Sequence, residues 1–174
     1  MGGIGRNLKR KAEAFGMKVV YHNRRRLENG LEDGAEYVES LEGLLKVADV
    51  VSLNLPLNAN TRHTISTAQF GVMKKSAILI NTARGAVVDE DALVKALDEG
   101  TIAGAGLDVY EDEPVVREGL LRNERVLLLP HVGTYTWETM YRMEAWAIEN
   151  VRVGVEEGRL VSPIPEHKDL SLGS

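Results

Sequence analysis

Short apolar runs rich in β-branched residues alternate with longer amphipathic stretches along most of the chain, and this alternation limits the possible folds more than any other feature. The runs predict strands at residues 18–21, 50–53, 77–80, 101–109 and 126–129. Stretches with helical periodicity lie between them, at residues 6–15, 41–47, 67–73 and 90–99. Parallel strands joined by crossover helices produce this pattern. We therefore expect an α/β fold with a doubly wound parallel sheet, its strands covered on both faces because they are almost continuously apolar.

The C-terminal part predicts one long helix and a polar tail. Apolar residues recur at steps of three and four over residues 134–157, which is typical of an amphipathic helix, and Gly158 follows as its cap. Gly16 and Gly100 occupy the same capping position after earlier helices. Residues 162–174 contain no core-forming pattern, and we interpret them as a C-terminal arm or disordered tail.

Composition excludes several classes of function. Lys and Arg number 21 against 26 Asp and Glu, a net charge of −5, so the chain lacks the basic excess that nucleic-acid binding requires. The absence of cysteine excludes disulfides and a thiol nucleophile, and it favours a cytoplasmic location. No apolar run approaches the roughly 18 residues of a membrane span. We expect no nucleic-acid or membrane partner.

Residues 1–5, MGGIG, match the end of the dinucleotide-binding fingerprint G-x-G-x-x-G. The last two glycines of the fingerprint fall on Gly2 and Gly5, and the leading glycine is absent. A helix follows, and its N-terminal N–H groups can bind an anion. Gly2, Gly3, Ile4 and Gly5 are therefore candidate coenzyme-binding residues, with a flexible N-terminus as the alternative. We expect the strand that precedes such a loop to lie outside this chain, which leaves its two neighbours with unpaired edges.

The turn after the strand at residues 18–21 indicates which coenzyme binds. NAD-binding domains usually carry an acid there for the ribose 2′-hydroxyl. This chain instead has Asn23, Arg24, Arg25 and Arg26 and no carboxylate. Arginine attracts a 2′-phosphate, so the sequence favours NADP(H) over NAD(H), with Asn23, Arg24 and Arg25 as candidate contacts. An ordinary solvated basic turn is the alternative.

Three ionisable residues follow the ends of successive predicted strands. Arg84 lies in INTARGAVVDE, Glu113 in GAGLDVYEDEP and His131 in LLLPHVG. Open α/β sheets bind ligands at the carboxyl ends of their strands. Each residue alone would more often be a surface charge, but the three together indicate an active site.

These phrases, together with MGGIG and VVSLNLPLNANTRHTI in the same order, resemble the D-isomer-specific 2-hydroxyacid dehydrogenases. That family includes glyoxylate/hydroxypyruvate reductase, phosphoglycerate dehydrogenase and D-lactate dehydrogenase. The resemblance runs from Met1 to about Val161. It implies that residues 1–161 form a Rossmann-type NAD(P)-binding domain without its first strand.

The resemblance implies an oxidoreductase that transfers a hydride between NAD(P)H and a 2-oxo acid, giving a D-2-hydroxy acid of the glyoxylate or hydroxypyruvate type. Such a reduction needs a cation for the substrate carboxylate and an acid for the carbonyl oxygen. Arg84 would bind the carboxylate and polarise the 2-oxo group. His131 would donate the proton, and Glu113 would orient the imidazole and favour its charged form. The reaction needs no metal.

Further coenzyme contacts follow from the same resemblance. Asp108 matches the position that contacts the nicotinamide carboxamide, although it could equally bond local backbone. Candidate residues that line the coenzyme are Leu55, Pro56, Thr82, Ala83 and Gly133. Pro56 could also serve only to end its strand.

The chain departs from the family at several positions. Asn54 stands where many members have histidine, and Tyr135 and Trp137 stand where small residues are common. The two aromatic side chains either reshape the substrate pocket or simply pack. These departures leave the identity of the substrate undecided, but they do not change the predicted type of reaction.

Other functions remain in view. The alternative from a different class is a dinucleotide-sensing protein like the C-terminal-binding-protein corepressors, which resemble the same family. Formate dehydrogenases fit less well, because they carry glutamine at the position of Glu113.

The resemblance also implies a homodimer, and a substrate domain built mainly from residues upstream of the glycine loop. Without that domain water cannot be excluded from the active site, so we expect negligible catalysis by the 174-residue chain alone.

Overall fold

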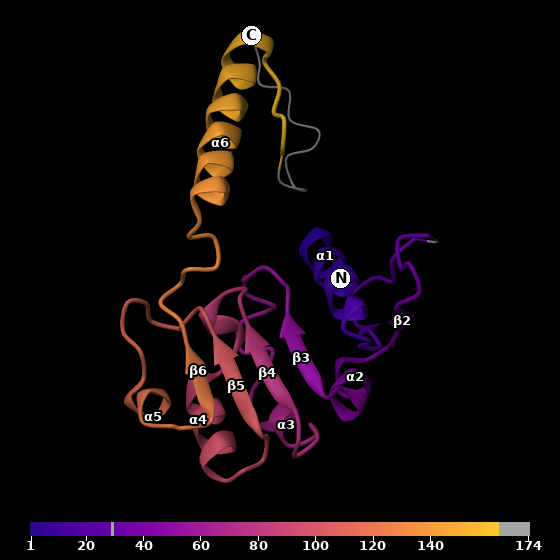
Figure 1. Cartoon of the computed structure of the whole chain (residues 1–174), viewed down its shortest axis with the longest axis vertical. Coiled ribbons are helices and arrows are strands. Elements are labelled where there is room, and N and C mark those ends of the chain that lie inside the picture. Colours follow the sequence, from indigo (N-terminus) through magenta and orange to yellow (C-terminus); the bar gives the residue numbers. More distant parts are fainter. Residues whose placement is uncertain (29, 164–174) are drawn as a thin grey trace. The chain divides into compact units, whose positions relative to one another are not determined.

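The computed structural model describes residues 1–28 and 30–163 (Figure 1). Its helices are α1 (Gly3–Ala14), α2 (Leu41–Val47), α3 (Thr67–Phe70), the 3-10 helix η1 (Gly85–Val87), α4 (Glu90–Asp98), α5 (Glu118–Leu121) and α6 (Trp137–Glu157). Its strands are β1 (Val20–Tyr21), β2 (Glu36–Tyr37), β3 (Val50–Leu53), β4 (Ile78–Asn81), β5 (Gly104–Leu107) and β6 (Val126–Leu128). The chain divides into two compact units, Met1–His131 and Val132–Ser174, which are described separately.

The described strands form two parallel sheets within the first unit. One pairs β1 with β2, and the other has the order β3-β4-β5-β6 (Figure 1). In the second sheet Leu53 lies opposite Asn81, Asn81 opposite Leu107, and Leu107 opposite Leu128, so the four carboxyl ends are aligned. Parallel strands with crossover helices confirm the predicted α/β fold class.

The unpaired edges expected from the sequence are also present. Among the described residues β1 pairs only with β2, and β3 pairs only with β4. In a doubly wound sheet these two strands flank a central strand. The edges of β1 and β3 therefore carry backbone groups that no strand of the described chain satisfies.

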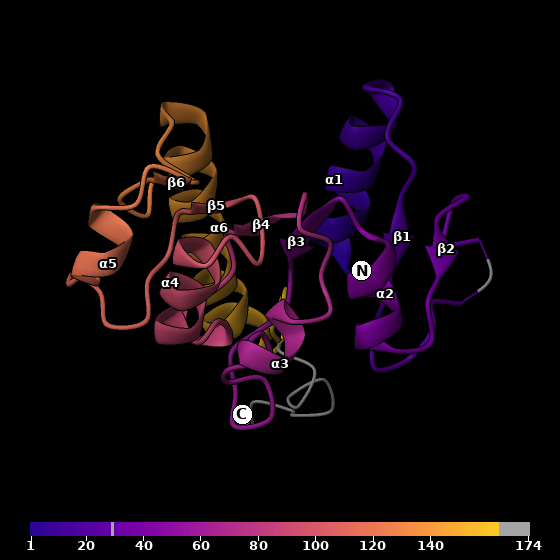
Figure 2. The same cartoon turned by 90° about the horizontal axis from the view of Figure 1, so that it is seen from below.

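The core lies on one face of the four-stranded sheet, where Figure 2 shows α3 and α4. Leu79 of β4, Phe70 of α3 and Leu93 of α4 are fully buried there. Side chains on the opposite face of these strands are far more exposed to solvent: Val50 is 49% exposed and Ile78 is 40% exposed. The expectation that both faces are covered is therefore wrong for β3 and β4 within the described chain. Successive side chains point to opposite faces, and this core covers only one of them.

Several element boundaries differ from the sequence prediction. Helix α1 begins at Gly3 instead of Arg6, and the strand expected over residues 101–109 is shortened to Gly104–Leu107. The elements β2, η1 and α5 were not predicted, because each is short and, unlike β1 and α3, was not recognised within a longer patterned stretch. The predicted glycine caps are confirmed, since φ is 73° at Gly16, 66° at Gly100 and 64° at Gly158.

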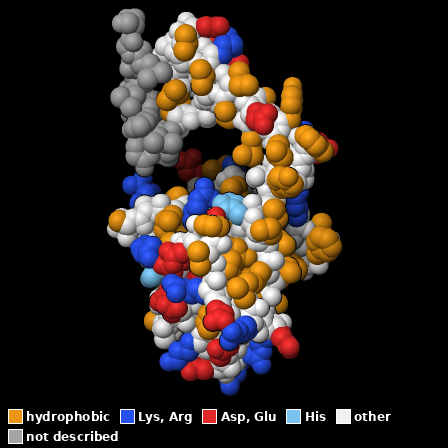
Figure 3. All heavy atoms as spheres, turned by 90° about the vertical axis from the view of Figure 1, so that its left-hand side faces the viewer, with side chains coloured by type: hydrophobic (Ala, Val, Ile, Leu, Met, Phe, Trp, Pro, Cys, Tyr) orange, Lys and Arg blue, Asp and Glu red, His pale blue; other side chains and the backbone are white. Residues whose placement is uncertain are grey.

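The second unit contains the long helix predicted from the sequence, α6. The hydroxyl of Thr136 caps its start by accepting a hydrogen bond from the Thr139 N–H at 3.2 Å. Its apolar side chains lie largely at the surface in Figure 3, with Trp137 87% and Val155 82% exposed. Of the predicted arm, residues 164–174 lie outside the described residues, and the domain limit at residue 161 stays a prediction. No helix in the described ranges is both long and apolar enough to cross a membrane.

The start of α4 gives a prediction about stability. Burial alone would raise the pKa of the Asp89 carboxyl, but the Ala92 N–H at 3.1 Å, the Ser66 hydroxyl at 2.8 Å and the nearby His63 hold that pKa below its ordinary value. We expect Asp89→Ala to lower the free energy of unfolding by about 1 kcal/mol, whereas Asp89→Asn, also a good cap, should cost much less. Because the folded-state pKa is lowered, the contribution of Asp89 is present above about pH 4 and is lost as the pH falls through that pKa. Urea unfolding at pH 7 and pH 3 measures this, and an equal loss for the two variants would contradict the cap.

Candidate active site

The three candidate catalytic residues follow adjacent strands of the four-stranded sheet. Arg84 lies three residues after the end of β4, Glu113 lies in the loop after β5, and His131 lies three residues after the end of β6. The aligned carboxyl ends of these strands bring their loops to one edge of the sheet. This edge is where open α/β sheets bind ligands.

Glu113 and His131 form a direct pair. His131 Nδ1 lies 2.8 Å from Glu113 Oε2. The hydrogen bond from His131 is the main cause that lowers the pKa of Glu113; the Tyr110 N–H and the charges of His131 and Arg84 act in the same direction, and burial opposes them. Because a carboxylate only accepts hydrogen bonds, we assign the proton to Nδ1. The other nitrogen, Nε2, is then the one that can exchange a proton with a ligand, and the side chain that carries it is 50% exposed.

Tyr110 connects the ends of β5 and β6. Its N–H donates to Glu113 Oε1 at 2.9 Å, and its hydroxyl donates to the carbonyl of Leu129 at 2.8 Å. Leu129 lies two residues before His131. One buried residue therefore contacts Glu113 directly and the strand that leads to His131.

Asn81 shapes the turn that carries Arg84. Its side chain is 1% exposed; Oδ1 accepts the Ala83 N–H and Nδ2 donates to the Arg84 carbonyl, both at 3.0 Å. The Arg84 side chain itself is exposed, with Nη1 donating to the Ala83 carbonyl at 2.6 Å. Sequence reasoning missed Asn81. The available signal was a single amide at the end of an otherwise apolar strand.

Gly85 brings the Arg84 turn against the loop that carries Glu113. A Cβ atom added at Gly85 would lie 1.8 Å from the carbonyl carbon of Tyr110 and 2.4 Å from the nitrogen of Glu111. Real Cβ atoms never approach so closely, so only glycine fits here. The backbones next to Arg84 and Glu113 are in direct contact.

The other coenzyme candidates of the first unit lie near the same sheet edge. Asp108 is buried directly after β5, and its N–H donates to the Asn81 carbonyl at 3.0 Å. Thr82 is exposed and Ala83 half-buried after β4, and after β3 the half-buried Leu55 precedes the exposed Pro56. Gly133 belongs to the second unit.

The glycine-rich start forms an open helix N-terminus. Gly2 is the N-cap of α1, and the first turn contains no acidic residue. A Cβ atom at Gly2 or Gly3 would meet nothing within 4 Å, whereas one at Gly5 would lie 3.0 Å from the Met1 side chain. Ile4 is exposed. An uncompensated helix dipole with open backbone fits the diphosphate of a dinucleotide.

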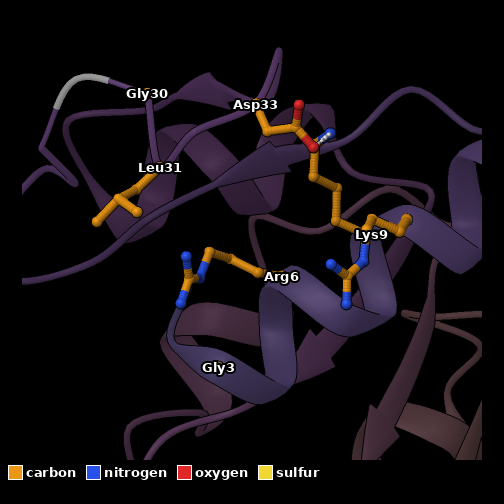
Figure 4. A pocket seen from close by; sticks show the side chains of 7 residues that line it. Gly3, Arg6, Lys9, Gly30, Leu31 and Asp33 are labelled. Atoms are coloured by element: carbon orange, nitrogen blue, oxygen red, sulfur yellow. Dashed lines mark hydrogen bonds and ion pairs between the residues drawn. The ribbon is translucent and has the colours of Figure 1, made fainter.

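A basic pocket lies beside α1, with a volume of about 290 Å³ (Figure 4). Lys9 is buried at its wall and pairs with Glu13 at 2.7 Å and Asp33 at 3.2 Å. Arg6 and Arg10 also line the pocket, and within residues 1–28 and 30–163 neither has an acidic partner. Sequence reasoning did not single out these arginines, although their spacing of four in α1 puts them on one helix face.

The basic turn after β1 separates into two kinds of arginine. Arg26 binds Glu32 through Nε at 2.8 Å and Nη2 at 3.1 Å, and Glu32 also accepts a hydrogen bond from the Tyr21 hydroxyl. These hydrogen bonds, Arg26 first, lower the pKa of Glu32 to about 2. Arg24 and Arg25 are exposed and make no ion pair with any described residue. Of the three arginines in this turn, Arg24 and Arg25 are therefore the two without an acidic partner in the described part of the chain.

Comparison with known proteins identifies the fold. The model of the family described as D-isomer specific 2-hydroxyacid dehydrogenase, NAD binding domain, matches residues 1–133. A glyoxylate reductase from Paecilomyes thermophila has a similar structure, with a TM-score of 0.93 and 54% identity over 97% of this chain and 51% of that one. The NADPH-dependent glyoxylate/hydroxypyruvate reductase of Sinorhizobium meliloti, solved with NADP and malonate, has a TM-score of 0.90 at 38% identity over 95% of this chain and 51% of that one.

Among curated relatives, 4-methyl-2-oxopentanoate reductase A of Aspergillus oryzae is 54% identical over 98% of this chain and 51% of its own length. Glyoxylate reductase 1 of Saccharomyces cerevisiae is 43% identical over 95% of this chain and 47% of its own length. The chain thus spans about half the length of the curated relatives it matches. By the match of its family model, the chain belongs to the D-isomer-specific 2-hydroxyacid dehydrogenases and contains their NAD-binding domain.

Proposed function

We propose that this chain provides the coenzyme-binding half of an enzyme that reduces small 2-oxo acids to D-2-hydroxy acids with NAD(P)H. The observation that carries the proposal is the pair formed by Glu113 and His131 beside the turn of Arg84. The pair supplies a positioned proton donor, and Arg84 supplies a cation for a carboxylate. The names of the relatives, which are reductases of glyoxylate and of 4-methyl-2-oxopentanoate, agree with this chemistry.

In the proposed reaction each side chain has one task. Arg84 binds the substrate carboxylate with its planar guanidinium and polarises the 2-oxo group. His131 gives the proton on Nε2 to the carbonyl oxygen, while its Nδ1 proton stays in the hydrogen bond to Glu113. The nicotinamide, when bound, supplies the hydride. In the reverse direction His131 takes the proton back.

A chimera tests the proposed function without assuming what adjoins this chain. In it, residues 1–174 replace the matching half of the Aspergillus oryzae reductase, which serves unchanged as the positive control. We expect the chimera to oxidise NADPH when glyoxylate, hydroxypyruvate or 4-methyl-2-oxopentanoate is added, and the 174-residue chain alone to show negligible turnover. A folded chimera that binds the coenzyme but reduces none of these acids would contradict the proposal and favour a dinucleotide-sensing protein. The relatives named above give no support to that alternative.

We propose NADP(H) as the preferred coenzyme, with the exposed Arg24 and Arg25 as its 2′-phosphate contacts. The NADP complex of the Sinorhizobium meliloti relative supports this choice. We expect Arg24→Ala and Arg25→Ala each to weaken NADPH binding by about tenfold and to leave NADH binding nearly unchanged, because only NADPH presents the phosphate. Calorimetric titration measures both affinities. Arg122→Ala, which removes a distant exposed charge paired with Glu118, is the matched control. Equal losses for both coenzymes would refute the assignment.

Neutralising Glu113 should change the pH dependence of the reaction. The hydrogen bond from His131 lowers the pKa of Glu113, so the pair depends on a negative charge that glutamine does not carry. In Glu113→Gln we expect the rate of reduction to decline at a lower pH than in the unchanged chimera. The pH profile of kcat measures the shift. An unchanged profile would contradict the proposed role of the pair. The homodimer and the cytoplasmic location remain predictions.

A further inference from the structure

A second carboxylate near the candidate site, Glu111, has an unusual set of contacts. Its side chain is 6% exposed, yet three cationic or basic groups meet it. His63 Nε2 lies 2.7 Å from Oε1, Arg62 also pairs with Oε1, and Arg117 Nη2 lies 3.6 Å from Oε2. Burial by itself would raise the pKa of Glu111, but His63, then Arg62 and Arg117, lower it overall. Glu111 is therefore held as a buried carboxylate.

The backbone of Glu111 is fixed as well. Its N–H donates to Glu90 Oε1 at 2.7 Å, and the Glu90 side chain is itself buried at the start of α4. On the other side, the peptide between Tyr110 and Glu111 packs directly on Gly85. Glu111 thus has little freedom to move, and neither do its immediate neighbours.

His63 connects this carboxylate to the segment after Arg84. The backbone of His63 is left-handed, with φ of 50°, and its N–H donates to the Ala86 carbonyl at 2.8 Å. Two residues later the Ile65 N–H donates to the Val87 carbonyl at 3.1 Å. The loop after β3 is therefore tied to η1 through its backbone and to the loop after β5 through His63 and Glu111.

These contacts converge on the pair that would move the proton. Glu111 lies between Tyr110, whose N–H holds Glu113 Oε1, and the short turn that ends at Glu113. We therefore expect a shift of Glu111 to displace the Tyr110 N–H relative to the Glu113 carboxylate. We propose that Glu111 is a positioning residue: clamped by His63, Arg62 and Arg117, it holds the loop of Glu113 against the Arg84 turn and so keeps Glu113 aligned with His131. This inference rests on the proposed function, which gives the alignment of Glu113 with His131 its role. The pH titration that tests it does not require catalytic activity.

The direction in which the pKa of Glu113 changes when Glu111 is replaced distinguishes a positioning role of Glu111 from a purely electrostatic one. The groups that face Glu113 are His131, the Tyr110 N–H and the charge of Arg84. The charged or titratable groups that face Glu111 are His63, Arg62, Arg117 and Glu90. Asp112 shares the Arg117 guanidinium with it. If Glu111 acted only through its charge, removing that charge would lower the pKa of Glu113, because one nearby negative charge would be lost. If Glu111 positions the loop, its loss weakens the hydrogen bonds to Glu113 and raises that pKa.

The experiment follows the carboxyl carbon of Glu113 by NMR through a pH titration of the 174-residue chain, with Glu113→Gln used to assign the signal. In Glu111→Gln we expect the pKa of Glu113 to rise toward the ordinary value of about 4.3. His63→Asn should give a smaller rise. Asparagine tolerates the left-handed backbone but is too short to reach Glu111 as the imidazole does. The His63 side chain is partly exposed, so His63→Asn tests the positioning role of Glu111 even if Glu111→Gln fails to fold.

Glu118→Gln is the matched control, because it removes the same charge from an exposed carboxylate at the start of α5 that pairs with Arg122, the C-cap of that helix. It should leave the pKa of Glu113 unchanged. In the active chimera, Glu111→Gln should lower kcat by about tenfold with little change in KM, and Glu118→Gln should change neither. A fall in the pKa of Glu113, or no change, in both folded variants would overturn the inference. A chimera without turnover would instead contradict the proposed function, and the titration would still test Glu111.

Discussion

Replacing His131 by asparagine is expected to lower kcat of the active chimera by about 10²- to 10⁴-fold, the usual contribution of a positioned acid or base. The Nε2 atom of His131 is the proton donor in the proposed reaction, and asparagine has no group that titrates near neutral pH. Asparagine is preferred to alanine here because φ of His131 is 56°, a left-handed conformation that asparagine adopts more easily. The substitution therefore removes the imidazole with little effect on the backbone.

The same variant should bind NADPH almost as tightly as the unchanged chimera, because His131 is not among the candidate coenzyme contacts. Steady-state kinetics with glyoxylate and calorimetric titration with NADPH measure the two effects separately. Glu113→Gln, which keeps the imidazole, should lose less activity than His131→Asn. If His131→Asn keeps more than about a tenth of kcat, some other group provides the proton.

The second large effect is expected from Gly85→Ala. The added Cβ atom would lie 1.8 Å from the carbonyl carbon of Tyr110 and 1.9 Å from its oxygen. These are backbone atoms, so no rotation of a side chain can relieve the overlap. We expect the free energy of unfolding to fall by about 3 kcal/mol, the upper end of the usual cost of overpacking. The midpoint of urea unfolding of the 174-residue chain measures this loss.

Gly71→Ala is the matched control for Gly85→Ala. Gly71 has helical backbone angles, and a Cβ atom there would lie 3.4 Å from the nearest atom, an ordinary contact. It should change stability little. Where Gly85→Ala still folds, the pKa of Glu113 should rise, because the loops of Arg84 and Glu113 are forced apart. An unfolding midpoint equal to that of Gly71→Ala would show that the two loops are not in contact.

The sequence predicted the candidate catalytic residues because each follows a strand within a recognisable phrase. It did not predict the residues that hold them. Glu111 and His63 are 48 residues apart, and their contact depends on how two loops fold back over one sheet edge. Likewise the sequence does not distinguish Arg26 from Arg24 and Arg25, whereas the structure pairs Arg26 alone of the three with Glu32. Long-range pairs of this kind leave no periodic pattern in a single sequence.

The fold was predictable to a similar extent. Periodicity gave the fold class, α2 and β3 with their observed limits, and the long helix α6. It gave the equally short β1 and α3 because each lies within a longer patterned stretch, at residues 18–21 and 67–73. It could not give β2, which has two residues, or α5, which has four, because neither was part of such a stretch. It also overestimated burial at Val50 and Ile78, since apolar character alone does not tell which face of a strand is covered.

The division of the strands into two sheets has a consequence for how the coenzyme would bind. The sheet of β1 and β2 contains two residues in each strand, and such a pair is marginal by itself. Its amide protons should exchange with solvent through local opening, whereas those of β4 and β5 should exchange only when the whole unit unfolds. Arg24 and Arg25 follow β1 of the less stable sheet. Arg84, Glu113 and His131 follow strands of the more stable one. A coenzyme that spans both would bind only the ordered fraction of molecules, so its measured affinity would report the stability of that small sheet as well as the fit of its phosphates.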